Sequence, residues 1–180
     1  MLRRRRAPAD RLAQVDPALV SPRFAGAVAG ALDARRRYAD VVAGVADGPV
    51  RDRLAEAGAR VDAGVAGVWE IARRATQVEA TLAALDPERV TDEYKRARRE
   101  GADPELETAL AQRFASVQRL LNALDDTEAR LRQLDAGLGA AVAGAAEVAL
   151  GVTPPERLGA ELDGVVGELG ALRGALDELA

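Results

Sequence analysis

The chain contains no cysteine and no histidine among its 180 residues. Without cysteine it has no disulfides, no catalytic thiolate and no Cys-ligated metal. Without histidine it lacks the commonest general base and the commonest metal ligand, and a di-iron bundle, which needs Glu-x-x-His on facing helices, is excluded. We therefore expect no cofactor, no metal site, no catalytic residues and no enzymatic activity.

Aromatic side chains are also scarce. They make up 3% of the chain, against 48% for all hydrophobic residues, so the core must consist of Ala, Val and Leu. Such side chains suit thin layers between helices better than a thick globular centre. Charged residues reach 30%, and abundant Ala, Glu, Arg and Leu are typical of long helices and coiled coils. The composition predicts an all-α protein.

Long apolar runs are missing as well. No stretch reaches the ~18 apolar residues that a membrane-spanning helix needs. The start of the chain, Met1 and Leu2 followed by Arg3 to Arg6, has no apolar run behind it and does not resemble a secretory signal. A net charge of −4 argues against nucleic acid as a partner of the whole surface. We expect a cytoplasmic protein.

Prolines and capping residues divide the remaining chain into helices. Ser21-Pro22, Asp86-Pro87 and Asp103-Pro104 each place a capping oxygen before a proline at the first helical position. We predict a basic, partly disordered tail over residues 1–20, with a short helix near 10–15. A single elongated helical domain follows over residues 21–180, with helices at about 22–46, 49–85, 87–100, 104–151 and 155–179.

The predicted helix over 49–85 has the most regular apolar pattern. Apolar or small residues alternate at spacings of three and four for about five heptads, which favours coiled-coil-like packing. They are Val50, Leu54, Ala57, Val61, Gly64, Val68, Ile71, Ala75, Val78, Leu82 and Leu85.

Helix lengths then predict the architecture. At ~1.5 Å per residue, the helix over 49–85 is roughly 55 Å long and the helix over 104–151 roughly 70 Å. The first and last helices are shorter, and short turns make sequential helices antiparallel neighbours. We expect an antiparallel bundle, four helices thick at one end. At the other end the long helices continue as a projecting helical hairpin, tipped or flanked by the helix over 87–100.

Two arginine clusters are candidates for binding anions. Arg3, Arg4, Arg5 and Arg6 would attract an anionic surface with ~1 kcal/mol per charge, or they form a solvated tail. Lys95, Arg96, Arg98 and Arg99 would form a phosphate-binding patch. Alternatively, these residues complement the dipole of their own helix, because acidic residues precede them.

Polar residues interrupt the apolar stripes at Arg35, Arg113 and Thr127. A polar residue at such a position costs stability and selects register or partner. Trp69, the only tryptophan, lies beside the main stripe of its helix. It either packs in the bundle core or, if exposed, marks a partner surface. Tyr94, with Val90, lines the apolar side of the helix over 87–100.

These observations predict a non-enzymatic helical interaction protein: an adaptor, scaffold or regulator that binds partner helices or itself. Elongated helix pairs with few aromatic residues leave little room for a pocket. Two alternatives stay open. The protein associates with a membrane surface or nucleic acid through its Arg-rich N-terminus, or it senses an anionic small molecule. The candidate interaction residues are Trp69, Tyr94, Arg96, Arg98, Arg99 and Arg113.

Overall fold

The computed structural model describes residues 12–178, and over this range the chain is helical without a β-strand. The predicted all-α fold is therefore confirmed. The elements are the short 3-10 helix η1 (Pro17–Leu19) and the α-helices α2 (Pro22–Ala43), α3 (Pro49–Ala84), α4 (Pro87–Glu100), α5 (Pro104–Ala149) and α6 (Pro155–Asp177).

The helices begin where the prolines and capping residues predict. The side chains of Ser21, Asp86 and Asp103 each accept a hydrogen bond from a backbone N–H in the first turn of the helix that follows. At the other end of α4, Gly101 has a φ of 66° and its N–H donates to the Ala97 carbonyl. This is the left-handed conformation that glycine adopts easily after a helix.

Four helices end earlier than predicted, α3 by a single residue, since Leu85 is its C-cap. The helix α2 ends at Ala43 rather than near residue 46. The Gly44 N–H still donates to the Asp40 carbonyl at 3.1 Å, and the chain then turns through Gly48, whose φ is 156°. The helix α5 ends at Ala149, just before Gly151 with its φ of 72°, and α6 ends at Asp177. Positive φ at Gly151 breaks the helical path after α5.

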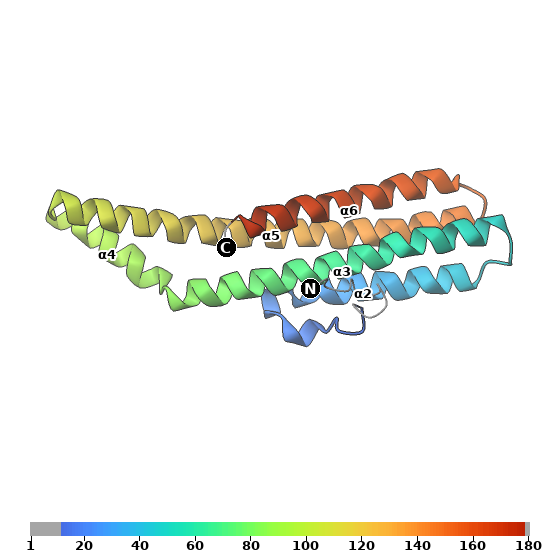
Figure 1. Cartoon of the computed structure of the whole chain (residues 1–180), viewed down its shortest axis with the longest axis horizontal. Coiled ribbons are helices and arrows are strands. Elements are labelled where there is room, and N and C mark those ends of the chain that lie inside the picture. The colour runs from blue at the N-terminus through green and yellow to red at the C-terminus, as the bar shows by residue number, and fades with distance from the viewer. Residues whose placement is uncertain (1–11, 179–180) are drawn as a thin grey trace, which may run out of the picture.

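Two ends of the molecule differ in thickness (Figure 1). At one end α2, α3, α5 and α6 form a four-helix bundle. There α2 and α6 each pack on both α3 and α5 and lie diagonally opposite one another. At the other end α4 continues the path of α3 after a bend and packs on α5. The predicted bundle with a projecting hairpin is therefore confirmed, whereas coiled-coil-like packing of its helices stays a prediction.

The apolar stripe of α3 forms one wall of the core. Its members from Leu54 to Leu82 are buried, and only the terminal residues Val50 and Leu85 are 40% and 37% exposed. Close helix approach depends on small residues, because a Cβ added at Gly64 would lie 3.1 Å from Leu138 Cδ2 on α5. The polar interruption Thr127 is 1% exposed, and its hydroxyl donates to the Ala123 carbonyl of its own helix at 2.7 Å.

The segment just before α2 contacts the bundle. Leu12 and Val15 pack against the core, and Val20 is 7% exposed. The Ser21 N–H donates to Thr76 Oγ1 on α3 at 3.0 Å, which fixes the segment to the bundle. This segment therefore contacts the bundle through a few apolar side chains, whereas Leu19 is 67% exposed. Residues 1–11, with the first two residues of the predicted short helix, lie outside the described residues. After Leu12 the rest of that predicted helix forms a turn, in which the Val15 N–H donates to the Leu12 carbonyl at 3.2 Å.

No helix within residues 12–178 has the length and apolar character to cross a membrane.

A pair of glycines in α2 provides a test of this packing. A Cβ at Gly26 would meet nothing within 4 Å, whereas at Gly30 it would lie 2.7 Å from Asp135 Cγ on α5. Replacing a helical glycine with alanine stabilises a helix by about 0.5–1 kcal/mol. We expect Gly26→Ala to raise the free energy of unfolding by that amount. Gly30→Ala should raise it less or lower it, because the Asp135 carboxyl must move. Urea denaturation measures both, and equal stabilisation would contradict the α2–α5 contact.

Candidate functional site

Trp69 belongs to the core. Its side chain is 6% exposed and packs with the buried residues of α3 and its neighbours. The Arg73 guanidinium lies 5.7 Å from the centre of its ring and covers the outer side. The interpretation of Trp69 as an exposed partner surface is therefore wrong, because the side of α3 beside the main stripe also faces other helices in a four-helix bundle.

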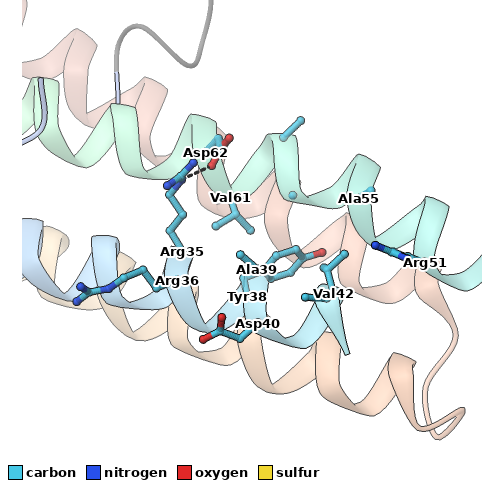
Figure 2. A pocket seen from close by; sticks show the side chains of 13 residues that line it. Arg35, Arg36, Tyr38, Ala39, Asp40, Val42, Arg51, Ala55, Val61 and Asp62 are labelled. Carbon is cyan, nitrogen blue, oxygen red and sulfur yellow. Dashed lines mark hydrogen bonds and ion pairs between the residues drawn. The ribbon is translucent and has the colours of Figure 1, made fainter. Parts of the chain in front are cut away.

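A groove of about 710 Å³ lies between α2 and α3 (Figure 2). Small apolar side chains such as Ala39, Val42 and Ala55 line it, with arginines at its rim. Arg35 Nε donates to Asp62 Oδ1 at 2.6 Å, the contact marked by the dashed line in Figure 2. Arg35 interrupts the apolar stripe of α2, and this ion pair to α3 accounts for its tolerance there.

The arginines of this groove already hold carboxylates. In addition to Arg35 with Asp62, Arg36 is paired with Asp33 and Arg51 with Asp47. An anionic ligand would have to displace one of these carboxylates. The groove therefore gives little support to the hypothesis of an anionic small-molecule sensor.

Tyr38 lies at the inner side of the groove and is 3% exposed. Its hydroxyl donates to the Leu54 carbonyl at 2.8 Å. Burial raises the pKa of Tyr38 to about 12, against the opposing effect of the Arg60 charge. The phenol is therefore protonated at neutral pH and joins α2 to α3, and it is not available there as a base.

The hairpin consists of α4 and the N-terminal part of α5, and aromatic stacking holds these two helices together. The rings of Tyr94 and Phe114 lie 4.9 Å apart with an interplanar angle of 20°. Val90 and Val117 are 0% and 1% exposed, and Ala97 is 7% exposed. Tyr94 is thus a packing residue of the hairpin.

Ion pairs between α4 and α5 add to the aromatic contact. Arg113 Nη1 donates to Glu93 Oε2 at 3.2 Å, and Arg98 Nε lies 3.8 Å from Glu107 Oε1. The Arg98 guanidinium also lies 5.9 Å from the centre of the Tyr94 ring. Arg98 and Arg113 therefore form ion pairs within the hairpin, and of the predicted basic patch Arg98 is the residue that has such a partner.

The other basic residues of α4 stay in solvent. Lys95, Arg96 and Arg99 are exposed. Within residues 12–178, no carboxylate lies within 4.0 Å of their charged groups. The predicted anionic-surface residues Arg3 to Arg6 lie outside the described residues, and that prediction stays untested.

The apolar stripe of α5 changes its exposure along the helix. In the bundle Leu124, Leu131 and Leu138 are each 1% exposed, whereas in the hairpin Leu106 is 51% exposed. Further hairpin residues of this helix are only partly buried: Leu110, Phe114, Leu120 and Leu121. The reason is geometric, because α2, α3 and α6 surround α5 in the bundle and α4 alone covers it in the hairpin. The sequence analysis did not name Leu106 as a candidate interaction residue. Its position in the part of α5 that lies beyond the four-helix bundle could have indicated that it is exposed.

Comparison with protein-family models, with curated proteins and with solved structures finds no match to this chain. Among residues 12–178 no group of three or more acidic side chains is arranged to hold a metal ion. The case for a functional site therefore rests on the surface geometry of this chain.

Titration of Tyr38 is a direct test of the α2–α3 contact. The variant Tyr94→Phe leaves Tyr38 as the only tyrosine. With the native pKa raised to about 12 and an unfolded value of about 10, stability from this group is complete below pH 10 and falls as the pH rises toward 12. Ultraviolet absorbance at pH 11 should show about a tenth of the phenol ionised in the folded protein and about nine tenths in denaturant. Equal ionisation in both states would contradict burial of Tyr38.

The stacked pair is a test of the hairpin. We expect Tyr94→Ala to destabilise the α4–α5 contact by about 1–2 kcal/mol, because the ring contributes both buried area and stacking. Hydrogen exchange followed by mass spectrometry should speed up in α4 and in residues 104–121, and not in α2 or α6. The conservative variant Tyr94→Phe should exchange like the original chain. A uniform increase across all helices would contradict a separately stabilised hairpin.

Proposed function

We propose that this chain is a non-enzymatic interaction protein whose docking surface is the hairpin of α4 and α5. The observation that supports the proposal is the change in exposure along α5. The same apolar stripe is closed in the bundle and leaves Leu106 51% exposed in the hairpin. A helix from another polypeptide, or from a second copy of this chain, would cover the stripe as α2, α3 and α6 cover it elsewhere.

Hydrophobic burial would provide the driving force for docking. Apolar surface removed from water contributes about 25 cal/mol per Å², and recognition of an amphipathic helix by an apolar surface is a common binding mode. The hairpin offers partly exposed leucines next to the charged helix α4. The apolar residues would supply affinity, and the charges would supply orientation and choice of partner.

The bundle would act as the rigid base of this surface. Its core joins α5 to three other helices through residues that are almost entirely buried, such as Leu124, Leu131 and Leu138. A hairpin that projects from such a base has little conformational entropy to lose on binding. This arrangement suits an adaptor or scaffold better than a catalyst, since the chain also lacks histidine and cysteine.

Photo-crosslinking in cells that naturally contain the protein tests the proposal. A photo-reactive amino acid replaces Leu106 in one variant. In the matched control it replaces Val166, a large apolar residue of the bundle that is 37% exposed. We expect adducts with another polypeptide from position 106, at several times the yield obtained from position 166.

The yields from positions 106 and 166 show whether the hairpin binds partners more than the bundle surface does. Equal yields from both positions, or none from position 106, would contradict the hairpin as a docking surface. Adding Leu106→Asp to a variant with the photo-reactive residue at Leu110 should remove its adducts, because the charge prevents burial of the stripe. Since Leu106 is half exposed, this substitution leaves the fold intact, and circular dichroism checks that it does.

A further inference from the structure

A stripe of alternating charges runs along one side of α4. Arg89, Glu93, Arg96 and Glu100 follow one another at spacings of four, three and four, which places them on one side of a helix. Glu93 and Arg89 interact at 3.6 Å, and Arg89 Nε also lies 3.3 Å from Asp86 Oδ2. Arg96 and Glu100 are exposed, and neither forms an ion pair within residues 12–178.

A matching stripe lies on α5. Leu106, Arg113 and Leu120 follow one another at every seventh position, so they also share one side of their helix. The contact of Arg113 Nη1 with Glu93 Oε2 at 3.2 Å joins the two stripes. They therefore lie on the same side of the hairpin, and we call their residues together the hairpin face.

The charge order on α4 is self-complementary. When the stripe is placed against a second copy running in the opposite direction, Arg89 faces Glu100 and Glu93 faces Arg96. Every facing pair then has opposite charges, and the twofold relation forms each pair twice. In a parallel alignment each residue would face its own copy, and every pair would repel.

The apolar residues on α5 are also complementary when two copies are antiparallel. Reversal about Arg113 places Leu106 of one copy against Leu120 of the other, because both leucines are seven residues from that arginine. Leu106 is 51% exposed, and Leu120 is partly buried against the bundle core. Each copy would thus cover the exposed leucine of the other.

A single twofold axis satisfies both stripes. The midpoint of the α4 stripe falls between Tyr94 and Lys95, and the midpoint of the α5 stripe is Arg113. These midpoints are neighbours in space, because Tyr94 stacks on Phe114 at 4.9 Å and Glu93 binds Arg113. At the axis each Arg113 keeps its own Glu93, which offsets the repulsion between the two arginines.

We propose that the hairpin face binds the hairpin face of a second copy of this chain in antiparallel orientation. This inference rests on the proposed function and names the partner for the same surface. The bundle ends would then point in opposite directions, and the dimer would be a rod much longer than one chain. Its ion pairs are exposed, so salt should weaken the association.

Sedimentation velocity over a range of protein concentrations and at two salt concentrations measures this association. We expect a monomer–dimer equilibrium that shifts toward monomer at high salt. Glu100→Arg should raise the dissociation constant about tenfold, because two symmetry-related attractive pairs become repulsive. Leu106→Asp should abolish the dimer.

Charge exchange is the most specific test. Adding Arg89→Glu to Glu100→Arg restores opposite charges across the axis, so the double variant should recover the original dissociation constant within about threefold. The control Glu88→Arg makes the same change in charge outside the hairpin face, since Glu88 lines the groove near Thr91 and Leu121 instead. It should leave association unchanged.

Disulfide formation locates the axis. The chain has no cysteine of its own, so Arg113→Cys places a single thiol at the axis and should give a covalent dimer on mild oxidation. The control Ala171→Cys, at an exposed position of α6, should stay monomeric. A dimer that forms equally through Ala171→Cys, or that ignores Glu100→Arg and Leu106→Asp, would overturn the proposal.

Failure of this inference and failure of the proposed function are distinguishable. If the chain stays monomeric at high concentration and low salt, the second copy is not the partner. Crosslinking from position 106 to other polypeptides would then still support the hairpin as a docking surface. If the chain is monomeric and position 106 captures nothing, both proposals fail.

Discussion

The continuous apolar stripe of α5 determines the shape of this molecule. The helix is 46 residues long, and its apolar side must be removed from water along that length for the fold to be stable. In the bundle α2, α3 and α6 surround it, and its leucines are almost completely buried. Beyond the ends of α2 and α6 only the last turns of α3 and then α4 remain, so the same stripe becomes partly exposed there (Figure 1).

The bundle and the hairpin also differ in the contacts that hold their helices together. In the bundle, helices approach closely through small residues, as Gly64 does against Leu138 Cδ2, and ion pairs lie at the edges. Arg23 of α2, for example, binds Glu128 of α5 at 2.7 Å at such an edge. In the hairpin only two helices pack together. A stacked aromatic pair and the Glu93–Arg113 ion pair hold them in place, where the bundle has the packing of a third and a fourth helix. Two of the five aromatic residues thus lie where the structure is thinnest.

Most of the fold was predictable from the sequence because its signals are local. Prolines behind capping residues mark the starts of helices, and relative helix lengths fix which segments lie side by side. The candidate site was less predictable. Whether Trp69 is exposed depends on the positions of several neighbouring helices, and whether an arginine is free depends on carboxylates far away in sequence. Arg96 and Arg98 belong to the same basic cluster in the sequence, yet only Arg98 has a carboxylate partner on the other helix of the hairpin.

Two polar residues interrupt the α5 stripe, and their burial depends on how many helices surround them. Thr127 lies in the bundle at 1% exposure, and a small hydroxyl is tolerated there because it donates to its own helix at 2.7 Å. An arginine at that depth would bury a charge without compensating contacts, which is far more costly. Arg113 lies in the hairpin, where its side chain is 42% exposed and reaches Glu93 on α4. Within α5, the type of polar residue in the stripe therefore follows the number of helices that surround that stretch.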